Sequence, residues 1–222
     1  MIRYIARYLT ASILCAVMWM GIRGCSSNFG PSHRSAFLDS RSFSTASTLR
    51  SISSYSHRFL STPVNVPSQG AVIHYAPAEE LEPIDVQLIE NTTSDHLDIA
   101  MYAFTDMPIA RAVVDAANRG VKVKIYRDDE QFAQEQRREP YVLALLRSNP
   151  NISIRVKNSR VLMHIKGWSD GIILREGSAN WSRSGEQDQD NTLSLTRDAR
   201  SVQGFEDNFQ HIWERTSNLV VQ

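Results

Sequence analysis

Cysteine is almost absent from this chain of 222 residues, and its two copies, Cys15 and Cys25, lie near the N-terminus. The remaining residues therefore cannot form a disulfide with one another or a zinc site built on cysteine. The chain also lacks the run of about 20 apolar residues that a full membrane span needs, since its longest, Thr10–Gly21, is much shorter. No internal repeat is visible.

Net charge is also absent, because 24 basic residues balance 24 acidic ones, but the two signs are unevenly distributed. Residues 1–70 hold seven arginines and one acid, which leaves 17 basic against 23 acidic residues in 71–222. This asymmetry predicts a basic leader joined to a self-contained acidic domain. Because such a domain has no global field that attracts nucleic acid, a local patch has to bind any polyanion.

The N-terminal residues have the composition of a targeting segment. Arg3 and Arg7 precede the apolar run, which favours a signal peptide or membrane anchor over residues 1–25. The residues before Cys25 also resemble a lipoprotein signal, so lipidation is an alternative. The Arg- and Ser-rich stretch through Ser61 fits an organellar transit peptide instead. We expect an exported or cell-envelope protein, either periplasmic or membrane-anchored, with organelle targeting as the alternative.

A serine-rich segment separates the leader from the rest of the chain. Residues 26–70 are roughly a third serine with little apolar periodicity, which predicts a flexible, solvated linker. Pro63, Pro67 and Gly70 punctuate its end. We therefore place the catalytic domain at residues 71–222.

Strand and helix patterns alternate along this domain. His96–Phe104 reads as a buried strand, Ile109–Asn118 as a helix that ends at Gly120, and Val121–Tyr126 as a strand with one wet face. This order calls for a right-handed crossover and parallel pairing. The remaining expected elements are strands at 71–75, 152–156, 161–166, 171–174 and 191–196, and helices at 81–91, 130–147 and 199–213. They predict an α/β fold with a mixed sheet covered by helices.

His164 and Lys166 lie on one of the expected strands, two residues apart. Residues with this spacing project from the same face of a strand. A neutral imidazole can attack phosphorus, and a fixed cation beside it can bind the phosphate oxygens. Lysine occurs only four times in the domain, so a lysine two residues after a histidine is less often expected by chance. Without further context, a partly exposed strand without chemistry is the commoner explanation for His-x-Lys.

A second polar cluster follows at Gly177–Ser182. A Gly-Ser turn that enters a helix offers backbone donors and the hydroxyl of Ser178 to an oxyanion, while Asn180 adds an amide and Ser182 a second hydroxyl. The alternative is that Ser178 caps a short helix without any ligand. For the flanking tryptophans, 168 and 181, packing is favoured over stacking on a base or contacting an acyl chain.

Together the two clusters read M-H-I-K-(x3)-D-G-(x5)-G-S-A-N-W-S and resemble the HKD signature of the phospholipase D superfamily. Asp98–Val114, Gly120–Asp129 and Gln189–Asn191 are similar to segments that flank the motif in small bacterial, endonuclease-like members. The resemblance implies a mixed sheet flanked by helices on both faces, with a single HKD motif per chain. The family usually places four residues between lysine and aspartate, whereas three separate Lys166 from Asp170 here. Losing one residue changes side-chain parity within a strand.

The resemblance also implies a phosphodiesterase that needs no metal and no cofactor. Members with one motif form homodimers, so the active site is shared between two subunits. His164 of one subunit attacks phosphorus and forms a phosphohistidine, and His164 of the other protonates the leaving oxygen and then activates water. Lys166 and Asn180 bind the phosphoryl oxygens, and Ser178 orients them or a histidine.

Three further residues complete the expected site. Asp190 lies where relatives often carry an acid, and hydrogen bonding to the imidazole would set its tautomer. Asp188 is the rival for this role, and a solvated loop charge is the alternative for both. Asp170 and Ser182 are expected to support the site rather than to react.

Three interpretations of function remain open. The favoured one is a sequence-nonspecific endonuclease on DNA or RNA, because a local basic patch could follow a phosphate backbone. The expected substrate-binding residues are Arg155, Lys157, Arg160 and Arg183, with Arg175 also near the motif. One alternative is a phospholipase D-type hydrolase of phosphatidylcholine or cardiolipin, held at a membrane by the leader. The other is a non-catalytic dimer that binds nucleic acid, prompted by the shortened motif.

Overall fold

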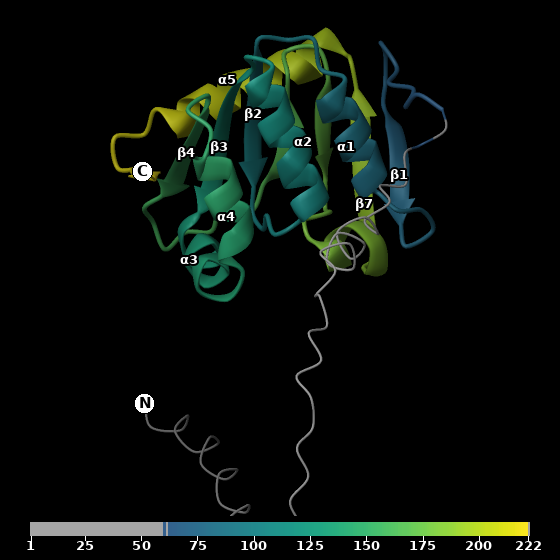
Figure 1. Ribbon diagram of the computed structural model, residues 1–222. Helices are drawn as coiled ribbons and strands as arrows, with labels where there is room; N and C mark the ends of the chain where they lie inside the picture. The colour runs from purple at the N-terminus through teal and green to yellow at the C-terminus, as the bar shows by residue number, and fades with distance from the viewer. Residues whose placement is uncertain (1–59, 61, 222) are drawn as a thin grey trace, which may run out of the picture. The chain divides into compact units, whose positions relative to one another are not determined.

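The computed structural model describes residue 60 and residues 62–221 (Figure 1). The expected leader, residues 1–25, and most of the expected linker lie outside this part of the chain. Among the described residues, no helix is both long and apolar enough to cross a membrane.

A mixed sheet of eight strands runs through the described part of the chain, in the order β1-β7-β6-β5-β2-β3-β4-β8. Neighbours pair in parallel from β2 through β3 to β4, and antiparallel elsewhere. The strands are β1 Val72–Ala76, β2 His96–Met101, β3 Lys122–Asp128, β4 Ile152–Lys157, β5 Lys166–Ser169, β6 Leu174–Gly177, β7 Asn191–Thr196 and β8 Leu219–Val221. The expected α/β fold with a mixed sheet is confirmed.

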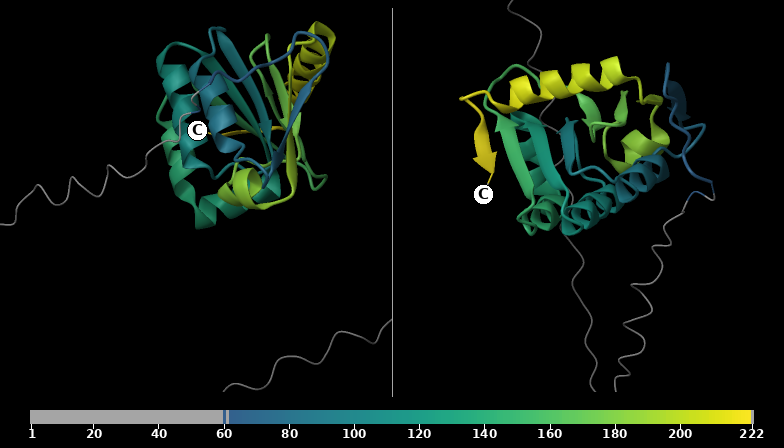
Figure 2. Two further views of the ribbon diagram at one scale, coloured as in Figure 1. Left: turned by 90° about the vertical axis from the view of Figure 1, so that its right-hand side faces the viewer. Right: turned by 90° about the horizontal axis from the view of Figure 1, so that it is seen from above.

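Helices cover both faces of this sheet, as Figure 2 shows from above. The helices are α1 Glu82–Glu90, α2 Met107–Asn118, α3 Asp129–Arg138, α4 Pro140–Arg147, the short π-helix η1 Ser184–Asp188 and α5 Ala199–Trp213. The larger core joins α1, α2 and α4 to one face, and a smaller core lies under α5 on the other. Burying apolar area on both faces is what stabilises such a sheet.

The crossover from β2 through α2 to β3 forms as expected. Asp106 caps α2, because its carboxylate accepts a hydrogen bond from the backbone N of Ile109 at 3.0 Å. Gly120 follows the helix with φ of 105°, a conformation that side chains with a Cβ rarely adopt. The chain then enters β3, which pairs in parallel with β2.

Three expected elements are wrong in extent. The helix expected at 130–147 is interrupted, because Pro140 has no N–H to continue it and restricts Glu139 to non-helical angles. The strands expected at 161–166 and 171–174 lie three to five residues later, as β5 and β6. Residues 161–165 stay outside the sheet because the N–H of Met163 bonds to a side chain, Asp128 Oδ2, at 2.9 Å.

The end of the expected linker packs against the domain. Val66 is buried, and the backbone N of Arg197 donates to the carbonyl of Pro67 at 2.8 Å. Thr196 Oγ1 donates to the carbonyl of Gly70. The sequence placed the start of the domain at Ala71. The packed part of the chain therefore begins before the expected start.

Candidate active site

The polar clusters of the motif meet at one end of two central strands, where β2 ends and β5 begins. Met101, the last residue of β2, pairs with Lys166, the first residue of β5. The next residues of the chain after β2, Tyr102 and Ala103, contact both clusters. The Tyr102 ring lies against His164 and Lys166, and the N–H of Ala103 donates to Asn180 Oδ1 at 3.3 Å. The structure thus brings His164, Lys166 and Asn180 around one short segment.

His164 is exposed and precedes β5 rather than lying within a strand. His164 and Lys166 therefore do not share a strand face, contrary to the expectation, although the two residues remain neighbours. The imidazole meets the Tyr102 ring edge-on, with centroids 4.7 Å apart. Desolvation, aided by the positive charge of Lys166, lowers the pKa of His164, and the negative charge of Asp128 opposes this. The lowered pKa favours the neutral form that a nucleophile requires.

Lys166 is buried, with a relative exposure of 6%, at the start of β5. Its Nζ donates to the backbone oxygen of His164 at 3.0 Å and lies 5.0 Å from the centre of the Tyr102 ring. Burial lowers the pKa of the Lys166 ammonium to about 8. The group is thus a fixed cation at neutral pH, held beside the imidazole by hydrogen bonding and a cation–π contact.

Asn180 and Ser178 use their side chains differently. The Asn180 oxygen accepts from the backbone of Ala103, which directs the amide NH2 group, a donor, away from that contact. Ser178 Oγ donates to Asn191 Oδ1 at 2.9 Å and accepts from the backbone N of Thr192 at 2.9 Å. Ser178 therefore joins the end of β6 to the start of β7. It caps no helix, since η1 begins later and has Arg183 at its N-cap.

The expected supporting residues lie in two different places. Asp170 is at the far end of β5, where its Oδ1 accepts from the backbone N of Ile172 at 3.0 Å and of Ile173 at 2.8 Å. Its Oδ2 accepts from Thr92 Oγ1 at 2.7 Å. Ser182 Oγ accepts from the backbone N of Gly185 at 3.2 Å at the start of η1. Both residues hold turns of the backbone.

Asp190 and Asp188 are exposed, beside the start of β7 and at the end of η1 respectively. In the structure as described, neither forms a hydrogen bond or ion pair with His164. The carboxylate whose negative charge raises the pKa of His164 is instead Asp128, at the end of β3. An acid beside the histidine was expected, but from a later part of the chain.

The expected basic patch is smaller than the sequence indicated. Arg175 is fully buried, and Arg155 donates to the carbonyl of Trp213 and lies 4.6 Å from the centre of its ring. Lys157 Nζ donates to a loop carbonyl at 3.3 Å. Arg160 and Arg183 are exposed, with no contact to the other site residues. Surface cations near the motif therefore come mainly from Lys157, Arg160 and Arg183.

Two large apolar side chains lie beside these cations. Val161 and Leu162 are 70% and 51% exposed, two or three residues before His164. This exposure was not expected, because both residues were assigned to a strand. The rim of the site is consequently part basic and part apolar.

A buried ionic cluster supports both halves of the motif from behind. Arg175 Nη2 lies 2.9 Å from Asp85 Oδ2 and 3.2 Å from Glu186 Oε1. Its Nη1 donates to the backbone oxygens of Lys166 at 3.1 Å and Ala179 at 3.2 Å. One guanidinium thus fixes the start of β5 and the residue before Asn180. Burial raises the pKa of Glu186, and the positive charge of Arg175 opposes this.

Trp168 and Trp181 belong to the same cluster. Both side chains are fully buried, and their Nε1 atoms donate to Asp85 at 2.7 and 2.9 Å. The expectation that they pack rather than stack on a substrate agrees with this burial. The Tyr102 ring contacts both His164 and Lys166. The sequence contained no local signal for the cluster, because Arg175 and Glu176 are adjacent charges in β6 and lie outside the strand expected at 171–174.

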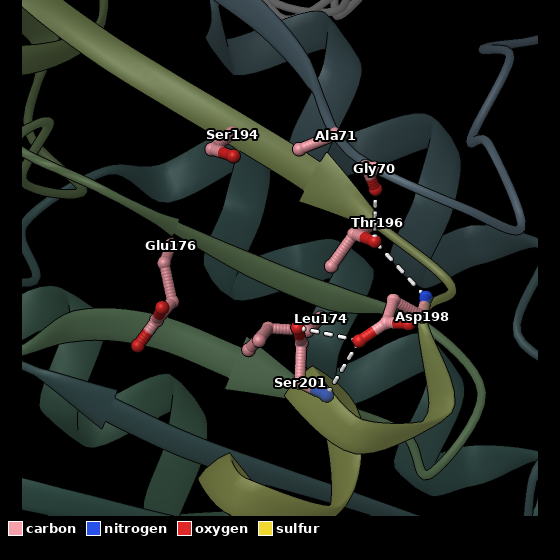
Figure 3. A pocket seen from close by; sticks show the side chains of 8 residues that line it. All are labelled: Gly70, Ala71, Leu174, Glu176, Ser194, Thr196, Asp198 and Ser201. Carbon is pink, nitrogen blue, oxygen red and sulfur yellow. Dashed lines mark hydrogen bonds between the residues drawn. The ribbon is translucent and has the colours of Figure 1, made fainter.

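A cavity of about 360 Å³ lies at the opposite end of β6 and β7 (Figure 3). Its polar groups hold the backbone, since Asp198 accepts from the backbone N of Ser201 at 2.9 Å and caps α5. His164 is not part of its wall. The lining residues are Gly70, Ala71, Leu174, Glu176, Ser194, Thr196, Asp198 and Ser201. Among the described residues, no group of three or more His, Cys, Asp or Glu side chains could hold a metal ion.

An exposed imidazole of lowered pKa lies beside a buried ammonium, on a mixed sheet between helices, so the protein is of the α/β class with a candidate histidine site. The chain belongs to the phospholipase D-like family, because the family model described as "Cardiolipin synthase, PLD-like domain" matches residues 86–213. This match includes every residue of the expected catalytic set.

Curated relatives give the same placement. Mitochondrial cardiolipin hydrolase of Xenopus tropicalis is 27% identical over 119 residues, which are 53% of this chain and 54% of the relative. The enzyme of that name from Homo sapiens is 30% identical over 120 residues, 54% of this chain and 46% of the relative. The chain spans about half the length of the curated relatives it matches.

Two solved structures share the fold over nearly their whole length. Nuc from Salmonella typhimurium, a phospholipase D family member, has a TM-score of 0.58 at 19% identity, covering 69% of this chain and 98% of Nuc. NucT from Helicobacter pylori has a TM-score of 0.58 at 24% identity, covering 68% of this chain and 99% of NucT. The likeness covers helices on both faces of the mixed sheet, as the sequence predicted.

Proposed function

We propose that this chain is a phosphodiesterase that hydrolyses its substrate through a phosphohistidine at His164. The carrying observation is the exposed imidazole of lowered pKa beside the fixed ammonium of Lys166. Attack by the imidazole on phosphorus forms the N–P bond and displaces the leaving oxygen, and water then hydrolyses the N–P bond. Lys166 and the Asn180 amide bind the phosphoryl oxygens during both steps.

The proposed reaction needs a proton donor for the leaving oxygen as well as a nucleophile. A homodimer with the active site shared between two subunits supplies this group as a second His164. The second imidazole donates its proton to the leaving oxygen and then accepts one from the attacking water. The exposure of His164 supports this arrangement, because the imidazole is accessible to a second subunit as well as to substrate.

We propose a nucleic-acid strand as the first substrate, cut without sequence preference. The exposed Arg160 and Arg183 and the half-buried Lys157 support this, because the phosphate backbone is bound mainly by Lys and Arg. Because the patch is small and the domain acidic, binding should be weak, and with few phosphate contacts its affinity should fall only modestly as salt is added.

A phospholipid is the second candidate, and a specific observation favours it. Val161 and Leu162 expose two adjacent apolar side chains close to His164, a surface suited to acyl chains at a bilayer interface. Several relatives carry the name mitochondrial cardiolipin hydrolase. The apolar run in residues 1–25 would provide the membrane attachment.

The full-length chain in EDTA decides between these substrates. Labelled single-stranded DNA, duplex DNA, RNA and vesicles of phosphatidylcholine or cardiolipin are offered in parallel. We expect cleavage of at least one of them, its loss in His164→Ala, and its retention in His211→Ala, a matched exposed histidine on α5. Binding of nucleic acid that is indifferent to His164→Ala, with no cleavage of any substrate, would instead support a non-catalytic dimer.

We further propose that residues 1–25 direct the chain to export or to the cell envelope and that a flexible linker follows. Organelle targeting is the alternative, and the relatives named mitochondrial point the same way. Fractionation of cells that produce the full-length chain, with and without residues 1–25, tests this. Identical distributions of the two forms would contradict it.

A further inference from the structure

Asp128, the last residue of β3, lies beneath the loop that leads to His164. Its carboxylate is buried, with a relative exposure of 2%. Oδ1 accepts from the backbone N of Gln131 at 3.1 Å, which caps α3, and Oδ2 accepts from the backbone N of Met163 at 2.9 Å. One side chain therefore joins a strand end, a helix start and the residue that precedes the expected nucleophile.

Local hydrogen bonds hold the first part of the loop, among them one from Lys157 Nζ to the carbonyl of Leu162. Residues 158–165 form no strand, and Val161 and Leu162 point their apolar side chains into solvent. Only at Met163 does the chain become buried, where the side chain packs in the core under α5. On the other side of His164, the carbonyl of Ile165 accepts from the backbone N of Tyr102 at 3.0 Å. The segment that presents the imidazole is thus held at three backbone points, since Lys166 Nζ also donates to the carbonyl of His164, and Asp128 makes the first.

The carboxylate also acts on the imidazole through its charge. The charged groups that face His164 are Lys166 from β5, which lowers its pKa, and Asp128 from β3, which raises it. The uncharged Tyr102 ring packs against the imidazole, and Lys157 pairs with Asp128 in the register of β4 with β3. Asp128 therefore offsets part of the effect that the neighbouring ammonium has on His164.

We propose that Asp128 is a positioning residue for the nucleophile, fixing the backbone before His164 and balancing the charge of Lys166 at the imidazole. The proposal rests on the proposed function, since it assigns Asp128 a role through His164 rather than a contact with substrate. Gln131 and Met163 each require an acceptor. An asparagine offers only one carboxamide oxygen and so satisfies only one of them.

The test compares Asp128→Asn with Asp198→Asn in the full-length chain, using bis(4-nitrophenyl) phosphate as a small diester. Asp198 also caps a helix, α5, through one oxygen, but it lies by the cavity at the other end of β7. We expect Asp128→Asn to lower kcat by about 10- to 100-fold with little change in KM, because the nucleophile is misplaced. Asp198→Asn should leave both constants unchanged.

The pH profile separates positioning from a merely structural effect. Because the charge of Asp128 raises the pKa of His164, Asp128→Asn should move the acid limb of kcat/KM to lower pH. Asp128→Glu, which keeps the charge, should restore the acid limb. If Asp128→Asn matches Asp198→Asn in both kcat and acid limb, the proposal is overturned.

A measurement on the unmodified chain keeps the proposal testable if the Asp128 variants fail to fold. Amide hydrogen exchange should be markedly slower at Met163 than at Leu162, and equal rates would overturn the anchoring role. The two failures can be told apart. If the native chain cleaves no diester, the proposed function falls, whereas cleavage that depends on His164 but not on Asp128 overturns the positioning role alone.

Discussion

The two ends of β5 carry the two halves of the HKD motif, and they differ in what their side chains do. At the first end, Lys166 is a buried cation whose Nζ donates to the backbone oxygen of the exposed His164. At the other, Asp170 accepts three hydrogen bonds, from Ile172, Ile173 and Thr92, and closes the turn into β6. The shortened spacing between Lys166 and Asp170 therefore falls in β5, between a residue proposed for chemistry and a residue whose carboxylate holds a turn.

The largest effect is expected at the Lys166 end. Lys166→Met should lower kcat by about 100- to 1,000-fold, because one donor to the phosphoryl oxygens is lost. The fold should survive, since an apolar side chain replaces a desolvated ammonium. Steady-state kinetics and a thermal melt measure the two quantities. Activity within tenfold of the native chain would remove Lys166 from the site.

At the Asp170 end we expect a substitution to lower stability more than activity. Asp170→Ala leaves two backbone N–H groups and a threonine hydroxyl without their acceptor, and should lower the free energy of unfolding by about 2–3 kcal/mol. At temperatures where the variant is folded, kcat should change by only a few-fold. Urea denaturation alongside the kinetic assay checks both values. A large loss of kcat in a stably folded Asp170→Ala protein would contradict the structural role.

The smallest effect concerns pH. Because burial lowers the pKa of Lys166 to about 8, below the ordinary value of 10.5, the unfolded chain binds more protons at this residue between these two pH values. Its contribution should therefore make the free energy of unfolding rise as pH increases from about 8 to 10.5. Denaturation of the native chain and of Lys166→Met across this range isolates the contribution by difference. Identical pH dependence of the two proteins would contradict it.

Sequence reasoning succeeded where one element contained its own signal. The terminal helix was expected at 199–213 and is observed as Ala199–Trp213, because Val202, Phe205, Phe209 and Trp213 recur at helical spacing over its whole length. The motif also grouped His164, Lys166 and Asn180, and the fold brings these residues around Tyr102 and Ala103. Their catalytic roles stay predictions.

The misses depend on contacts between distant residues. β5 begins at Lys166 and not at 161 because Asp128, 35 residues earlier, accepts the N–H of Met163. Arg175 left the expected surface patch because Asp85, 90 residues earlier, pairs with it in the core. Hydropathy cannot reveal such partners, because residue type alone does not distinguish a buried arginine from an exposed one. The three-residue β8 was missed because it is too short for a periodic pattern.

The central claim is that His164 becomes covalently phosphorylated during turnover. Rapid mixing of the full-length chain with a cleavable diester, quenching in base, and mass spectrometry of the peptides measures this directly. We predict a phosphorus adduct on the peptide that contains His164, absent in His164→Ala and present in His211→Ala. Turnover that proceeds without such an adduct, or that persists in His164→Ala, would contradict the account.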